Sequence, residues 1–116
     1  MLELLGRTEC SGKVPLGVCS RDVFLPLDPR TPESTQWRDR EMWAEAFSAG
    51  GFSTEVQCIR IGDLALAGIP GEAQVGFGAQ IAGGSPFPIT RGVGLANDEC
   101  AYLLSEESRA RGGYEA

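Results

Sequence analysis

Histidine is missing from this sequence: none occurs among the 116 residues. Because histidine is the commonest metal ligand in proteins, a histidine-dependent metal site cannot be built from this chain alone. Cysteine offers little replacement, since no two of the four cysteines form a C-x-x-C pair (Cys10, Cys19, Cys58 and Cys100). We expect these thiols to be free and buried among apolar side chains.

Long hydrophobic runs are also missing. No stretch approaches the roughly 20 apolar residues that a helix needs to span a bilayer. The start of the chain, MLELLGRTEC, lacks the basic region and the long apolar core of a secretory signal. We therefore expect a cytoplasmic protein without a membrane span.

Positive charge is scarce, since 10 Lys and Arg residues stand against 16 Asp and Glu residues and give a net charge of −6. Nucleic acids are bound by basic surfaces, so this acidic balance argues against DNA or RNA as a partner. The chain is 42% hydrophobic and 22% charged, which is typical of a globular protein rather than a disordered one. Its length suits a single domain over residues 1–116.

The apolar pattern predicts regular structure after a leader, residues 1–20, in which no clear pattern is visible. Residues 22–27 are apolar enough for a strand, which Pro26 limits to an edge or an end. A helix is expected over residues 32–48, where apolar positions recur at helical spacing. Its aromatic stripe, which includes Trp43, is expected to pack in the core or in a subunit interface.

An antiparallel hairpin is expected next, because residues 54–61 alternate and a tight turn at Gly62 leads into a second strand at residues 64–69. This second strand is almost wholly apolar, so we expect it to be central and covered on both faces. A further helix is predicted over residues 72–82, followed by a strand at residues 89–95.

A short strand at residues 102–104 and a short helix at residues 106–110 complete the pattern. The main elements run strand, helix, strand, strand, helix, strand, which is a split βαβ order (βαββαβ). This order predicts an α+β fold, a two-layer sandwich in which a mixed sheet carries helices on one face.

Three segments together resemble a known family: VQCIRIGDLALAGIPGE at residues 56–72, SPFPITRGVGLAND at residues 85–98 and AYLLSEESRARGGYE at residues 101–115. Read without gaps over residues 56–115, they are similar to the last third of the catalytic domain of the neutral/alkaline, non-lysosomal ceramidases and their bacterial relatives. Those enzymes are zinc amidases. The resemblance is weaker over residues 25–51 and is lost towards the start of the chain.

The resemblance implies two zinc-ligand positions. Glu72 matches the glutamate ligand of the family's Pro-Gly-Glu turn, in which Gly71 is the glycine. Tyr102 matches the second tyrosine of a pattern that starts at Asn97, whereas Glu99 replaces the first tyrosine. From the residues alone, Glu72 could equally stabilise a helix start and Tyr102 could be a packed core tyrosine.

Tyr114 belongs to a Gly-Gly-Tyr-Glu segment that also matches the family. The family's two histidine ligands and its catalytic serine lie upstream of the matching region, and the chain has no counterpart of the histidines. Because catalytic zinc normally has three protein ligands and an open position, the two retained positions would hold the metal too weakly for catalysis. We expect no resident cofactor, and zinc if any metal.

We therefore expect a remnant of a ceramidase-like domain that has no amidase activity by itself. Its sheet edge and its apolar helix would need covering, so we expect a homodimer; a lipid-like ligand is a further option. The alternative is a subunit of a zinc-dependent amidase whose histidines and nucleophile come from another chain, or whose acidic side chains hold Mg²⁺ or Ca²⁺. A gene fragment without a selected function is the third interpretation.

Overall fold

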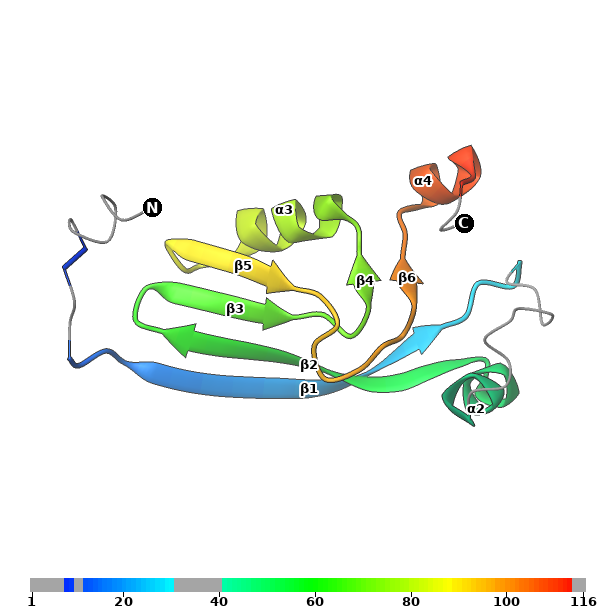
Figure 1. The fold of residues 1–116 in the computed structure, drawn as a ribbon, viewed down its shortest axis with the longest axis horizontal. Helices are drawn as coiled ribbons and strands as arrows, with labels where there is room; N and C mark the ends of the chain where they lie inside the picture. Colours follow the sequence, from blue (N-terminus) through cyan, green and yellow to red (C-terminus); the bar gives the residue numbers. More distant parts are fainter. Residues whose placement is uncertain (1–7, 10–11, 31–40, 114–116) are drawn as a thin grey trace.

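The computed structural model describes residues 8–9, 12–30 and 41–113. Their fold is α+β, as predicted, with a mixed four-stranded sheet and a separate two-stranded sheet. The elements follow one another in the order β1 (Leu16–Pro26), α2 (Glu41–Ala49), β2 (Gly51–Ile61), β3 (Leu64–Gly68), β4 (Glu72–Ala73), α3 (Val75–Gly84), β5 (Ile89–Val93), β6 (Tyr102–Leu103) and α4 (Glu106–Arg111) (Figure 1).

The large sheet has the strand order β1-β2-β3-β5. The strand β2 pairs antiparallel with β1 and with β3, and β3 pairs parallel with β5 across the connection that contains α3. The predicted hairpin is confirmed: Gly62 takes a φ of 61° in the turn between β2 and β3, a conformation that glycine adopts without strain. The small sheet consists of β4 and β6, which run parallel.

Helices α2 and α3 cover the same face of the large sheet. Trp43 of α2 makes an edge-to-face contact with Phe52 of β2, with 5.1 Å between the ring centroids. On the same face, a Cβ atom on Gly92 of β5 would lie 3.6 Å from the Cα atom of Gly78 in α3. The strand register places Phe52, Ala65 and Gly92 on one side of the sheet, which confirms that these helices lie on one face.

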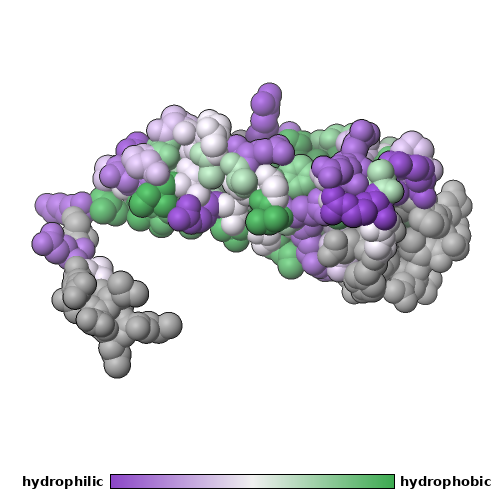
Figure 2. Space-filling view, turned by 90° about the horizontal axis from the view of Figure 1, so that it is seen from above, coloured by the Kyte–Doolittle hydropathy of each residue, from purple (hydrophilic) through white to green (hydrophobic). Residues whose placement is uncertain are grey.

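The opposite face of the sheet is open, and we call it the open face. Its strands expose large aliphatic side chains at 36–76% of their surface (Leu16, Val18, Ile59, Ile61, Ile89 and Val93). Hydrophobic side chains are visible at the surface among hydrophilic ones in Figure 2. The strand β3 is central, as expected, but the prediction that both its faces are covered is wrong for the described residues.

Two predicted boundaries in the first half of the chain need comment: the start of the first strand and the extent of the first helix. The first strand begins at Leu16, inside the predicted leader, because all of β1 pairs with β2 from Leu16↔Ile61 to Pro26↔Gly51. Only the end of the helix predicted at residues 32–48 lies within the described residues, as α2.

Two further predictions need correction. The helix expected from residue 72 begins at Val75, because Glu72 and Ala73 form β4 instead. Of the cysteines within the described residues, Cys100 is buried, Cys58 is half-buried and Cys19 is exposed, so the expectation of burial is wrong for Cys19. Among the described helices, none combines the length and the apolar character that crossing a bilayer requires.

Candidate functional site

The structure brings together the two positions that the resemblance implies as zinc ligands. Glu72 of β4 and Tyr102 of β6 are direct partners in the parallel register of the small sheet. Adjacent strands lie about 4.8 Å apart, and residues in register project to the same side, so the carboxylate and the phenol are neighbours on one surface. Both side chains are exposed, Tyr102 at 37% of its surface.

Backbone hydrogen bonds hold the two strands in this register. The amide of Glu72 donates to the carbonyl of Ala101 at 2.9 Å, and the amide of Gln74 donates to that of Leu103 at 3.3 Å. The strand positions of Glu72 and Tyr102 are therefore fixed by main-chain contacts.

Gly71 is placed where only glycine fits. It is buried, and a Cβ atom there would lie 2.6 Å from the carbonyl oxygen of Ala101 and 3.2 Å from Cγ of Leu103. Real Cβ atoms essentially never come so close to a backbone oxygen. The glycine of the Pro-Gly-Glu turn thus permits the close approach of β6 to β4.

Asn97 lies in the loop between β5 and β6, in the left-handed conformation with a φ of 70°. Leu95 and Ala101 of the same loop also have positive φ values, of 53° and 60°. Non-glycine residues rarely adopt this conformation, because it is strained. It persists only where contacts with the surrounding structure hold the backbone in place. Here the loop is determined by hydrogen bonds from three of its amides to the carbonyls of residues 69–71 (Leu95 to Gly71, Ala96 to Ile69 and Cys100 to Pro70).

A second attachment ties this loop to the large sheet. The hydroxyl of Thr54 in β2, which is buried, donates to the carboxylate of Asp98 at 2.8 Å. Cys100, two residues later, packs with Trp43 and Phe52 in the core, and burial raises the pKa of its thiol. The loop that precedes Tyr102 is thus held by the segment between β3 and β4 and by β2 of the large sheet.

The alternative interpretations of Glu72 and Tyr102 fit the structure poorly. Glu72 lies in β4 before the N-cap residue Gln74, and the first turn of α3 contains no acidic residue. Tyr102 is too exposed for a packed core tyrosine. Tyr114, the remaining family-matching position, lies outside the described residues.

The Glu72–Tyr102 pair would offer two oxygen donors to a metal. Within residues 8–9, 12–30 and 41–113, no group of three or more His, Cys, Asp or Glu side chains is arranged to hold an ion. Two donors are fewer than the three protein ligands that catalytic zinc normally has. The same finding offers no support for an acidic site for Mg²⁺ or Ca²⁺ within the described residues.

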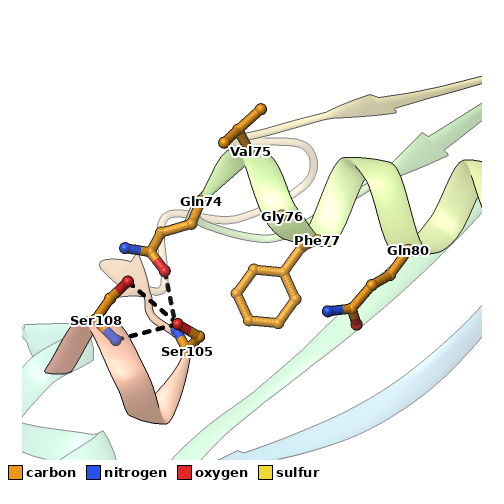
Figure 3. Close-up of a pocket in the computed structure, with 7 residues that line it drawn as sticks. All are labelled: Gln74, Val75, Gly76, Phe77, Gln80, Ser105 and Ser108. Atoms are coloured by element: carbon orange, nitrogen blue, oxygen red, sulfur yellow. Dashed lines mark hydrogen bonds between the residues drawn. The ribbon is translucent and has the colours of Figure 1, made fainter. Parts of the chain in front are cut away.

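A groove of about 420 Å³ lies just beyond the carboxyl ends of β4 and β6, between the starts of α3 and α4. Figure 3 shows the Phe77 ring and the side chains of Gln74 and Gln80 around it. The amide oxygen of Gln74 accepts from the Ser105 amide at 3.0 Å, and the Ser105 hydroxyl caps α4 by accepting from the Ser108 amide at 3.2 Å. The lining is neutral and mixes amides, hydroxyls and one aromatic ring.

The sequence did not predict this groove. The one signal it offered is Ser105 before two glutamates, which is typical of a helix start. Comparisons with protein-family models, with curated proteins and with solved structures each find no match to this chain. The comparisons therefore do not test the expected relation to ceramidases.

Proposed function

We propose that this chain is a remnant of a neutral ceramidase-like domain that retains the Glu72–Tyr102 pair, associates with itself and has no amidase activity by itself. The observation that supports the proposal is the register of β4 and β6. Two residues that lie 30 positions apart in the sequence, and that the resemblance alone singles out, are direct partners on neighbouring strands. Two ligands of one zinc ion must lie side by side on one surface, and this arrangement supports the proposal that the pair is half of a zinc site.

The lack of independent activity follows from the ligand count. A zinc ion that activates water needs three protein ligands and an open position, and the metal must lower the pKa of that water. Glu72 and Tyr102 supply two ligands, and the chain contains no histidine to add. A zinc ion on this pair would be bound weakly and would exchange with solvent.

Self-association is supported by the exposed apolar side chains, part of which form the open face. Among the described residues, eleven large hydrophobic side chains are exposed, whereas the buried apolar core consists of five residues. A chain that exposes more large apolar side chains than it buries gains free energy when a second surface covers them.

A second candidate function is supported by the exposure of the pair. Because Glu72 and Tyr102 both reach the surface, another chain that carries two histidines could complete the zinc site there. In this alternative the protein is one subunit of a zinc-dependent amidase.

An amidase assay distinguishes the two candidates. The purified chain is incubated with a short-chain ceramide, with and without added zinc, and release of the free fatty acid is measured. We expect no hydrolysis above a Glu72→Gln control under either condition. Zinc-dependent hydrolysis that the Glu72→Gln variant loses would contradict the remnant proposal. Activity that arises only with a histidine-bearing partner chain would favour the subunit alternative.

A further inference from the structure

The strand β1 is an unusually long open edge. It has 11 residues, whereas strands in globular proteins typically have about 5–6. It stands at the end of the strand order, and within the part of the chain that the structure describes, no strand pairs with its outer side (Figure 1). Monomeric proteins blunt such edges with lysines, prolines or bulges. The strand β1 has no lysine and no bulge; its charged residues are Arg21 and Asp22, and its single proline, Pro26, is its last residue.

The hydrogen bonds at both ends of β1 show which backbone groups point outward. Before the strand, the carbonyl of Pro15 accepts from the Gly62 amide at 2.8 Å; after it, the Leu27 amide donates to Gly50 at 3.0 Å. The register is continuous between these points, so the odd-numbered residues of β1 bond to β2. The even-numbered residues direct their amides and carbonyls to the free edge (Leu16, Val18, Ser20, Asp22, Phe24 and Pro26).

We propose that two copies of this chain pair antiparallel through β1, about a twofold axis perpendicular to the sheet, with Leu16 of one copy opposite Pro26 of the other. A perpendicular axis keeps residues of one face on that face, so even-numbered residues meet even-numbered residues. In this register the five outward amides of each copy all find a carbonyl, because Pro26 is the one outward residue without an N–H. The two sheets become one sheet of eight strands.

The side chains favour this register over its neighbours. Val18 and Phe24, which are 69% and 52% exposed in the single chain, come to lie opposite each other, twice in the dimer. Ser20 comes to lie opposite Asp22. Sliding one copy by two residues separates Val18 from Phe24 in either direction. One slide places Val18 opposite Asp22, and the other places Asp22 opposite Asp22, a like-charge pair of the same kind as the Arg21 pair of the proposed register.

Arg21 lies at the twofold axis and faces its own copy, on the side of the sheet opposite to Val18. Like charges placed directly opposite each other weaken a strand pair. The dimer is therefore expected to be tighter at high salt than at low salt, because counterions screen the two guanidinium groups. This contact gives the self-association in the proposed function a defined edge-to-edge surface, which leaves the open face uncovered, and it does not depend on the relation to ceramidases.

Cross-linking through Arg21→Cys tests the register. The exposed Cys19, and Cys10, are first replaced by serine. At the axis, the two Cα atoms of residue 21 form a non-hydrogen-bonded pair about 4.5 Å apart, which a disulfide can bridge. The matched control is Ser20→Cys, whose two copies would lie roughly 8 Å apart, from the rise per residue and the strand spacing, and beyond the ~7 Å limit. We expect covalent dimers from Arg21→Cys alone under mild oxidation; equal or absent cross-linking in both variants would overturn the proposal.

A second pair of variants separates the interface from folding. Val18→Pro removes an outward amide that β2 does not use, so the chain should stay folded by circular dichroism and become monomeric by light scattering. Arg21→Thr removes the repulsion and should tighten the dimer about 2- to 5-fold. A folded Val18→Pro variant that still dimerises would contradict the edge pairing. Zinc content and amidase activity do not report on β1, so failure here leaves the proposed half of a zinc site and the proposed lack of amidase activity standing, and the reverse also holds.

Discussion

The close approach of β6 to the Pro-Gly-Glu turn makes Gly71→Ala the most informative single substitution. The new Cβ would lie 2.6 Å from the carbonyl oxygen of Ala101, and that oxygen accepts the Glu72 amide that joins β4 to β6. Neither atom can move without breaking the ladder. The substitution must therefore push Tyr102 away from Glu72.

The expected loss of stability has two parts. Overpacking costs about 1–3 kcal/mol, and weakening the two hydrogen bonds of the small sheet costs about 1 kcal/mol each. The free energy of unfolding should fall by about 3–5 kcal/mol in total, a large share of the ~5–15 kcal/mol that holds a domain together. Urea unfolding followed by tryptophan fluorescence measures this loss, and hydrogen exchange of the Glu72 amide reports on the broken bond directly.

Gly78→Ala is the matched control, because a Cβ there has no atom within 4 Å outside its own helix. In the helix α3 the alanine should raise stability by up to about 1 kcal/mol. If Gly71→Ala unfolds like the unchanged protein and its Glu72 amide exchanges no faster, then the small sheet is not built as described.

Three further predictions concern the loop before Tyr102 and the end of β1. Thr54→Val leaves the partly buried Asp98 carboxylate without its hydroxyl donor and should lower stability by about 1–3 kcal/mol, whereas Thr54→Ser should restore it, as measured by urea unfolding. Hydrogen bonds from Arg30, and the charge of Arg109, hold the pKa of Asp28 well below its usual value of 3.8. Its stabilising contribution is thus present above that value and is lost as the pH falls below it, so the stability difference from Asp28→Asn should shrink in acid. Because burial raises the pKa of Cys100, iodoacetamide should label Cys19 faster, as mass spectrometry of peptides would show.

The sequence predicted the elements that have strong local signals. The hairpin of β2 and β3 follows from period-two alternation around Gly62, and the α+β class follows from the order of the elements. The start of β1 at Leu16 was not predictable in this way, because residues 16–20 become a strand only by pairing with β2. The same reason explains β4: two residues carry no periodic pattern, and they are extended only because β6 lies beside them.

The sequence predicted which residues form the candidate site but not how they are arranged in space. The resemblance named Glu72 and Tyr102, yet nothing in the spacing of the chain indicates that they are strand partners. The groove combines Gln74 with Ser105, from segments that meet only in the fold. The open face was unpredictable for a different reason, since alternation shows that a strand has an apolar face but not whether another layer covers it.

The proposal that the chain carries only half of a zinc site is tested most directly by titrating zinc into the metal-free protein in a calorimeter. Glu72→Gln and Tyr102→Phe serve as matched variants that each remove one donor. We expect weak binding, with a dissociation constant well above the micromolar range, that either variant abolishes. One tightly bound zinc ion per chain, lost in both variants, would contradict the account, because it would require further ligands that this histidine-free chain is not expected to supply.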